Sequence, residues 1–318
     1  MPIENNDGLS ALIRSSDETR LATGFGFTEG PIWIPDDDCV LFSDIPNDRI
    51  HRWRPGTADA EVYREPSRNA NGLTLDATGA VLACEHSGRR VSRAPYADPA
   101  NPPTLVDRFE GHRFNSPNDV VVHSGGPIYF TDPTYGIRDS RQQGDMSVEQ
   151  ELPFQGVYRL DPNGTLTCLD RSFSQPNGLA FSPDESVLYV GDSQDRFVKR
   201  FAVEADGTLG ASELFVDMRG DERPGNPDGM KVDEDGRLWT TGAGGVWVVQ
   251  PDGRRLGVLS IPENPANIAF GGPAFGTLYL TARTSLYAVE TTVRGIAPGS
   301  RSSPAGRGDR GPDVPVQT

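Results

Sequence analysis

Cysteine is scarce in this sequence, and the few cysteines lie far apart and form no recognisable motif. The three cysteines among 318 residues are Cys39, Cys84 and Cys168. An odd number without a C-x-x-C pair argues against a disulfide framework and against a thiolate zinc site. We expect three reduced thiols that pack as small apolar side chains in a reducing cytoplasm.

Long apolar stretches are also missing. No segment approaches the ~20 consecutive apolar residues that an α-helix needs to cross a bilayer. Residues 1–10 lack the basic segment followed by an apolar one that marks a secretory signal peptide. The sequence therefore predicts a cytoplasmic protein without membrane association.

Positive charge is in deficit. Lysine and arginine number 30 against 45 aspartates and glutamates, which gives a net charge of -15. Nucleic-acid binding and adhesion to anionic membranes both depend on basic residues that neutralise phosphates. We accordingly expect neither partner, and we interpret the acidic surface as a source of solubility.

Long helices and several familiar catalytic motifs are absent as well. No long segment shows helical periodicity. There is no G-x-S-x-G, no H-E-x-x-H, and no G-x-G-x-x-G in a strand–helix–strand context. Serine-hydrolase, zinc-protease and dinucleotide-binding functions therefore lack support.

What the sequence does contain is a short phrase repeated six times. Each copy starts with Glu, Asn or Asp and runs into a short apolar segment. Successive copies begin roughly forty to sixty residues apart, a period typical of the four-stranded blade of a β-propeller. The six first residues are Glu29, Asn71, Asn118, Asn177, Asp228 and Asn267.

Short β-branched and aromatic runs between turns support this fold. We expect an all-β, six-bladed β-propeller with four-stranded blades and a central metal site, formed as a single domain by residues 1–293. The last blade lacks a strand, which residues 16–23 would supply so that no sheet edge remains open. Residues 137–153 are interpreted as a loop on one face, either a lid or a passive excursion. Residues 294–318, rich in Gly, Pro, Ser and Arg, are expected to be a disordered tail.

The six first residues would form a ring at one mouth of the propeller channel, because each begins the innermost strand of a blade. One interpretation is structural, since Asn and Asp often start strands by bonding local backbone in turns. Glu29 fits it poorly, because its longer side chain is a weak turn former. The other interpretation is a hard divalent cation held by oxygen ligands, with Glu29 and Asp228 balancing its charge. All-oxygen ligation favours Ca²⁺ or Mg²⁺, with Mn²⁺ and Zn²⁺ as further candidates.

Several longer motifs are specific in combination. They include Phe27-Thr-Glu-Gly-Pro-Ile-Trp, Asn71-Gly-Leu-Thr-Leu-Asp, Asn115-Ser-Pro-Asn-Asp-Val-Val-Val, Gln175-Pro-Asn-Gly-Leu-Ala-Phe and Pro227-Asp-Gly-Met-Lys-Val-Asp. Together they make the chain, from about residue 22 to residue 288, resemble the gluconolactonase/regucalcin (senescence marker protein) family, and most closely its bacterial gluconolactonase branch.

The resemblance implies a six-bladed propeller with one catalytic divalent metal, Ca²⁺ in the first place. It implies Glu29, Asn177 and Asp228 as metal ligands. It also implies that Asn118 faces the metal or the substrate and that Asp228 serves as the acid/base. One departure concerns substrate binding, because the animal branch has an Arg two residues before the counterpart of Asn118, where this chain has Ser116.

The expected activity is hydrolysis of a sugar lactone, a small-molecule substrate. A bound cation would polarise the lactone carbonyl and lower the pKa of a water molecule. Asp228 would accept the proton of that water, and Asn118 or Asn71 would donate hydrogen bonds to the developing oxyanion. The alternatives are a phosphotriesterase-like hydrolase, a hydrolase of secondary-metabolite lactones, and a calcium-binding propeller without turnover, since fold alone does not separate them.

Four further side chains are candidates for the site. His86, Asp132 and Tyr135 are predicted to face the substrate. The alternative is a surface or structural role for His86 and a plain turn role for Asp132 and Tyr135. Asp119 is a candidate for orienting the metal ligands, although alternation along a strand points its side chain away from the direction of Asn118.

Overall fold

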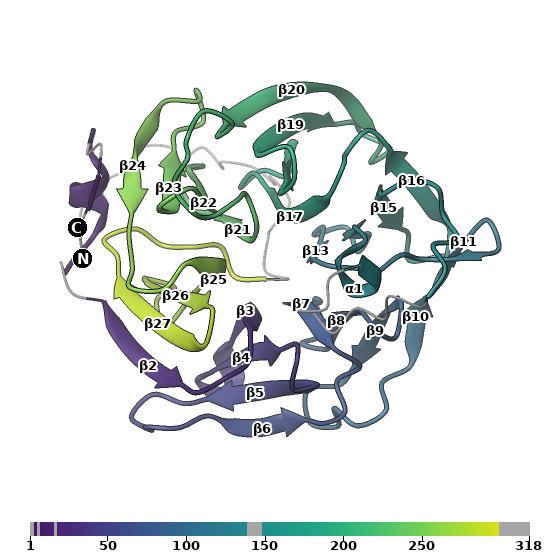
Figure 1. Ribbon diagram of the computed structural model, residues 1–318, viewed down its shortest axis with the longest axis horizontal. Coiled ribbons are helices and arrows are strands. Elements are labelled where there is room, and N and C mark those ends of the chain that lie inside the picture. The colour runs from purple at the N-terminus through teal and green to yellow at the C-terminus, as the bar shows by residue number, and fades with distance from the viewer. Residues whose placement is uncertain (1–2, 5–6, 16–17, 139–147, 299–318) are drawn as a thin grey trace, which may run out of the picture.

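The computed structural model describes residues 3–4, 7–15, 18–138 and 148–298, and their strands form six antiparallel blades around a central axis (Figure 1). The prediction of an all-β, six-bladed propeller is therefore confirmed. Within each blade the strands run in the following order from the axis outward. Blade 1 is β3 (Thr28–Ile34), β4 (Cys39–Asp44), β5 (Arg49–Trp53) and β6 (Glu61–Arg64), and blade 2 is β7 (Ala70–Leu75), β8 (Val81–Glu85), β9 (Arg90–Ala94) and β10 (Thr104–Val106). Blade 3 is β13 (Val120–Val122), β14 (Ile128–Asp132), β15 (Gly156–Leu160) and β16 (Leu166–Asp170), and blade 4 is β17 (Pro176–Phe181), β18 (Val187–Asp192), β19 (Phe197–Val203) and β20 (Leu209–Asp217). Blade 5 is β21 (Met230–Val232), β22 (Leu238–Gly242), β23 (Gly245–Val249) and β24 (Arg255–Leu259), and blade 6 is β25 (Pro265–Gly271), β26 (Thr277–Ala282), β27 (Ser285–Glu290) and β2 (Thr19–Thr23).

A few short elements lie outside the blades. They are β1 (Ile3–Glu4), which pairs with β24, the hairpin of β11 (Arg108–Phe109) and β12 (His112–Arg113), and the helices η1 (Leu9–Leu12), η2 (Pro35–Asp37) and α1 (Tyr135–Arg138). In the described part of the chain, no helix is long and apolar enough to cross a membrane. α1 overlaps the start of the predicted loop at 137–153. Residues 139–147 of that loop lie outside the described ranges, so a lid role stays a prediction.

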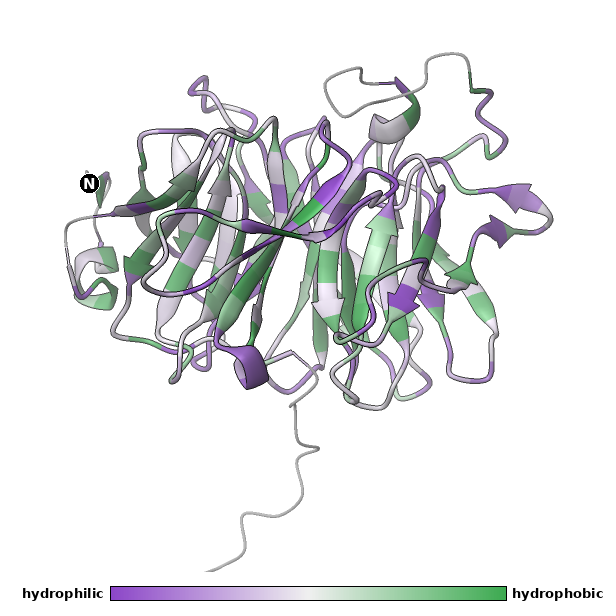
Figure 2. Cartoon of the chain, turned by 90° about the horizontal axis from the view of Figure 1, so that it is seen from below, coloured by the Kyte–Doolittle hydropathy of each residue, from purple (hydrophilic) through white to green (hydrophobic). Residues whose placement is uncertain are grey.

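The hydrophobic core is divided into six clusters, one at each interface between neighbouring blades. Between blades 5 and 6, for example, Trp239 of β22 packs in one cluster with Phe270 of β25. All seven residues of β3 and all seven of β25 are buried. Figure 2 shows apolar residues along the strands and hydrophilic ones concentrated in the loops at both faces. Because each interface removes apolar area from water at about 25 cal/mol per Å², packing between blades is a main source of stability.

The ring is closed by pairing the N-terminal strand with the C-terminal blade. β2 runs antiparallel to β27, with Thr19 opposite Ala288 and Thr23 opposite Ser285. This confirms the prediction that residues 16–23 contain the outer strand of the last blade. Ala22 of β2 is buried in the cluster that joins blade 6 to blade 1. Closure therefore covers an edge that would otherwise be open to pairing with other chains.

We expect Ala22→Asp to lower the melting temperature by roughly 5–10 °C, because it places an unpaired charge in an apolar cluster at a cost of about 3 kcal/mol. Arg20→Asp is the matched control, since Arg20 is exposed on the same strand. Thermal denaturation followed by circular dichroism measures both. Equal melting temperatures for the two variants would show that β2 contributes little to closure.

The described C-terminal segment passes beneath blades 5 and 6, at the opposite end of the axis from the six repeated residues. Arg294 O accepts a hydrogen bond from Glu234 N at 2.9 Å, and Gly295 N donates to Phe275 O at 2.9 Å. Ile296 and Pro298 line a small apolar cavity of about 60 Å³ between the inner strands. Within the predicted tail at 294–318, Arg294 is thus exposed and residues 295–298 are half-buried, while residues 299–318 lie outside the described ranges.

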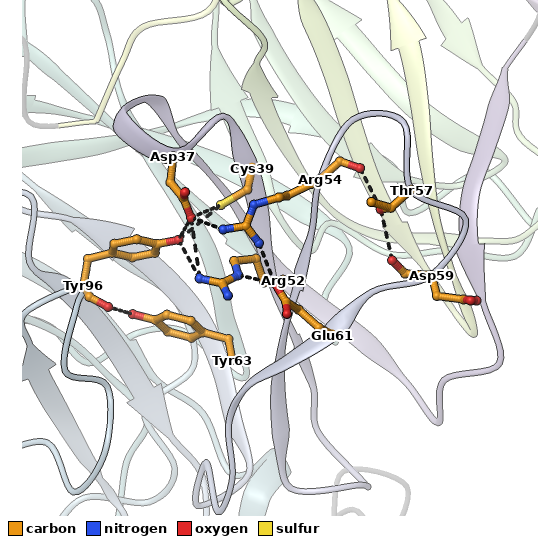
Figure 3. Close-up of polar contacts among 9 residues, drawn as sticks. All are labelled: Asp37, Cys39, Arg52, Arg54, Thr57, Asp59, Glu61, Tyr63 and Tyr96. Carbon is orange, nitrogen blue, oxygen red and sulfur yellow. Dashed lines mark hydrogen bonds and ion pairs between the residues drawn. The ribbon is translucent and has the colours of Figure 1, made fainter.

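A polar network ties blade 1 to blade 2 at their outer side (Figure 3). The Tyr96 hydroxyl of blade 2 donates a hydrogen bond to Asp37 of blade 1 and holds the pKa of that carboxyl below its usual value. Arg54 Nη2 donates to Asp37 Oδ2 at 2.6 Å, and Tyr63 OH donates to Tyr96 O at 2.7 Å. Cys39 borders the network, and burial raises the pKa of its thiol to about 11. Cys39, Cys84 and Cys168 are all free, as expected from their spacing.

Candidate active site

The six first residues of the repeated phrase meet around the axis at one end of the inner strands. Their side chains or carbonyl groups contact the neighbouring blade in turn. Asn267 Nδ2 of blade 6 donates to Glu29 Oε2 of blade 1 at 2.9 Å. Ser43 Oγ of blade 1 donates to Asn71 O of blade 2 at 2.7 Å, and Gly72 N of that blade donates to Asn118 O of blade 3 at 2.8 Å. The predicted ring therefore exists as a set of adjacent residues.

Glycine follows four of these residues because the inner strands converge too closely for a side chain. A Cβ at Gly30 would lie 2.0 Å from Asn71 O, and one at Gly178 would lie 2.0 Å from Asp228 O. A Cβ at Gly229 would lie 1.9 Å from Asn267 Oδ1. Such separations are far below contact distance, so the Glu-Gly, Asn-Gly and Asp-Gly pairs reflect the approach of neighbouring blades.

Three aspartates at the ends of second strands hold the segments that lead to the ring. Asp44 Oδ1 accepts hydrogen bonds from Gly26 N and Phe27 N, which precede Glu29 by three and two residues. Asp132 accepts from Asn115 N and Ser116 N, which precede Asn118 in the same way. Asp192 Oδ2 accepts from Ser174 N and Gln175 N before Asn177. Burial raises the pKa of Asp132 to about 7, although both backbone hydrogen bonds lower it. This equivalence gives Asp132 a backbone-anchoring role shared with Asp44 and Asp192.

Glu29 and Asp228 are the two carboxylates of the ring. Burial raises the pKa of Glu29 to about 7, in spite of hydrogen bonds from Gly30 N and from the Asn267 amide. Burial also raises the pKa of Asp228 well above its usual value, and the negative charge of Glu29 adds to the rise. Gly30 N and Asn267 Nδ2 both donate to Oε2 of Glu29, so Oε1 receives neither bond. Two neighbouring acids that disfavour each other's ionisation are an arrangement typical of functional sites.

A further acid and a lysine lie close to these carboxylates. Asp119 is buried, and its Oδ1 accepts a hydrogen bond from Val120 N at 2.9 Å. Its charge raises the pKa of both Glu29 and Asp228. The positive charge of Lys231 on β21 lowers the pKa of Glu29 and of Asp119. Asp119 is thus a third acid beside this pair, and its orienting role stays a prediction.

Asn71 and His86 lie side by side beneath α1. Asn71 Nδ2 is 3.2 Å from His86 Nε2, and His86 is fully buried. A Cβ at Gly136 of α1 would lie 2.6 Å from the Cβ of both His86 and Ser116. Ser116 Oγ accepts a hydrogen bond from Gly136 N at 2.9 Å and donates to Pro133 O at 2.6 Å. His86 and Ser116 therefore support α1, which carries Tyr135.

A cavity of about 400 Å³ opens above the ring. Asn177 and Asp228 line it from the ring, and Tyr135 lines it from α1. Asn177 Nδ2 donates to Ser193 Oγ at 2.9 Å, and Ser193 lines the cavity as well. The cavity therefore places a half-buried carboxylate and a carboxamide at the floor of a space large enough for a sugar-sized ligand.

The predicted residues divide into those at this cavity and those behind it. Tyr135, Asn177 and Asp228 line it. Glu29, Asn71 and Asn118 belong to the same ring but are almost completely buried, and His86 and Asp132 lie behind the cavity wall. The sequence interpretation missed Ser193, Asn226, Arg283 and Lys231. Lys231 had a signal, since it is a charged residue within an otherwise apolar inner strand, whereas the other three sit in loops brought together only by ring closure.

Several known proteins are similar to this chain in sequence and in fold. A family model described as SMP-30/Gluconolactonase/LRE-like region matches residues 27–284. Gluconolactonase of Zymomonas mobilis is 32% identical over 298 residues, which are 86% of this chain and 81% of that protein. The pentonolactonase XacC of Haloferax volcanii is 34% identical over 257 residues, 80% of each chain. The solved structure of a gluconolactonase from Xanthomonas campestris superposes with a TM-score of 0.82 at 32% identity, covering 92% of this chain and 95% of that one.

Proposed function

Because the chain belongs to the SMP-30/gluconolactonase/regucalcin family, we propose that it opens a sugar lactone by hydrolysis with the help of one divalent cation. The relatives named above act on gluconolactone or a pentonolactone, so the substrate class is that of aldonolactones. The observation that carries the proposal is the pair of neighbouring acids Glu29 and Asp228, of which Glu29 is buried and Asp228 is half-buried and lines the floor of the cavity.

The residues of the ring suit a hard cation by their chemistry. Glu29 and Asp228 would supply two negative charges, and Asn177 and Asn118 would add neutral amide oxygens. Within the described ranges, no group of three or more His, Cys, Asp or Glu side chains is placed to hold a metal ion. The amide oxygens are therefore necessary to complete a ligand set. An oxygen-only set favours Ca²⁺, with Mg²⁺, Mn²⁺ and Zn²⁺ as alternatives.

The chain's own groups would act on the substrate as follows. Bound at this site, a divalent cation polarises a carbonyl group and lowers the pKa of water. Asp228 would accept a proton from the attacking water, since it lines the cavity at the floor. Asn177 is held by Ser193, and Tyr135 by the supported helix α1, so both present fixed polar groups to the ligand.

The test is a pH-stat screen of aldonolactones on chelated protein, followed by addition of Ca²⁺, Mg²⁺, Mn²⁺ or Zn²⁺. We expect at least one metal to restore hydrolysis by about 100-fold over the chelated protein, corresponding to roughly 2.7 kcal/mol. The same metal should raise the melting temperature, because it binds only the folded state.

Three outcomes would contradict the proposal. A rise in melting temperature without turnover of any lactone would indicate a cation-binding propeller. Turnover of a phosphotriester but of no lactone would indicate the alternative hydrolase. Full activity in the chelated protein would show that the reaction does not require a cation.

A further inference from the structure

Arg283 is the only residue with a positive charge among the described residues that line the cavity above the ring. Asp228 is the only one with a negative charge. The chain as a whole carries a net charge of -15, so its long-range field repels anionic ligands. Arg283, a single arginine at the rim of this cavity, is therefore the group that would attract a negatively charged ligand.

The backbone of Arg283 is held rigidly. Arg283 forms the two-residue turn between β26 and β27 with Thr284, and its φ of 49° lies in the left-handed region, which is unfavourable for a residue with a Cβ. Its carbonyl oxygen accepts hydrogen bonds from Thr28 N at 2.8 Å and from Thr28 Oγ1 at 3.3 Å. Thr284 N and Oγ1 both donate to Glu263 Oε2, at 2.8 and 3.0 Å. Strain of this kind persists where the surrounding structure fixes it, often at binding sites.

The side chain of Arg283, in contrast, is not held by any other described residue. It is exposed, and within the described ranges its guanidinium makes no hydrogen bond or ion pair. Other arginines near this face are engaged: Arg223 pairs with Asp221 and Glu4, and Arg138 donates to Ile137 O and Val148 O. Glu263, the acid bonded to the neighbouring Thr284, accepts hydrogen bonds from Thr284, Ser285 and Tyr287 and forms no ion pair with Arg283 among the described residues.

We propose that Arg283 is a specificity residue that binds an anionic group at the end of the lactone remote from its reacting carbonyl. The inference rests on the proposed function, because it places the carbonyl at Asp228 on the floor and the remote end of the ligand at the rim. A guanidinium binds a carboxylate or a phosphate through two parallel N–H···O bonds. The preferred substrates are therefore lactones of acidic or phosphorylated sugars over neutral ones.

Matched lactones separate the contribution of the remote group. D-glucaro-1,4-lactone differs from D-glucono-1,4-lactone by a carboxylate in place of a hydroxymethyl group. 6-Phosphoglucono-1,5-lactone differs from glucono-1,5-lactone by a phosphate. We expect the wild type to favour the anionic member of at least one pair by about tenfold or more in kcat/KM, the size of one charge-assisted hydrogen bond. The pair that shows the preference identifies carboxylate or phosphate as the group recognised.

Arg283→Gln should raise KM for the preferred anionic lactone by about tenfold and leave kcat, and both constants for the neutral partner, within about twofold. Arg283→Lys should keep part of the preference, because it retains the charge but loses the planar fork. Arg254→Gln is the matched control, since Arg254 is exposed in the turn between β23 and β24, at the far end of the blade from the ring. Melting temperatures check that each variant is folded.

The inference is overturned if the wild type hydrolyses both members of each pair equally, or if Arg283→Gln leaves the ratio of anionic to neutral kcat/KM unchanged. It is also overturned if Arg254→Gln changes that ratio as much as Arg283→Gln does, because net charge would then explain the effect. Absence of hydrolysis of all four lactones would instead contradict the proposed function, which keeps the two failures distinct.

Discussion

Asp228→Asn is expected to lower kcat/KM for lactone hydrolysis by about 1,000-fold or more, because under the proposed function it removes both a charged metal ligand and the proton acceptor. The same change should leave the metal-free protein at least as stable as the wild type. Burial and the neighbouring charge of Glu29 both disfavour an ionised Asp228, and a neutral amide relieves that repulsion. A loss of turnover without a loss of stability is the signature of a functional rather than a structural group.

Glu29→Gln should behave in the same way, since glutamine keeps an oxygen that can accept from Gly30 N and from Asn267 Nδ2. Asp233→Asn is the control, because Asp233 is a fully buried carboxylate in the same segment that bonds Arg237 and Trp239. It should reduce stability and preserve turnover per folded molecule. Steady-state kinetics and thermal denaturation of the three variants provide the comparison. Turnover at the wild-type level in Asp228→Asn would refute the assignment.

Gly178→Ala should be severely destabilising, although it adds a single methyl group. The new Cβ would lie 2.0 Å from Asp228 O, and a backbone carbonyl of the next blade cannot rotate away as a side chain could. Relief requires blades 4 and 5 to move apart, which would separate Asn177 from Asp228. We expect a fall in melting temperature of roughly 10 °C or more, from an overpacking cost of at least about 3 kcal/mol, together with loss of hydrolysis.

Gly220→Ala is the matched control for this change. No heavy atom lies within 4 Å of a Cβ built at Gly220, so alanine there should be neutral. Soluble yield, melting temperature and turnover are compared for the two variants. If Gly178→Ala and the wild type have the same melting temperature, the glycine of the repeated phrase is not required for the close approach between blades.

The fold and the ring could be predicted because the same local signal recurs. Each copy of the phrase places one polar residue and one apolar strand at the same position in its blade, so a single register error does not hide the pattern. Residues 16–23 could be assigned because the last blade was one strand short. These inferences depend only on sequence order and strand count.

The surroundings of the ring could not be predicted in this way. Asp119 was expected to point away from Asn118 by strand alternation, but β13 begins only at Val120, so the pleat does not govern either residue. The role of glycine after the ring residues depends on distances between blades, which no single copy contains. Arg283 and Ser193 come from turns of different blades, and only closure of the ring brings them to one cavity.

Closure of the ring by β2 and β27 also sets the order of events when the protein is made. The contact of Thr23 Oγ1 with Thr284 O spans 261 positions of the chain. On a ribosome, blades 1 to 5 can assemble as each emerges, whereas β2 must wait beside an incomplete ring until β27 has been released. The entropy lost in joining such distant segments is offset only by the contacts that form at this final pairing. Pairing of β2 with β27 is therefore a candidate for the slow step of folding. Until then the edge of β2 stays unpaired and open to pairing with other chains.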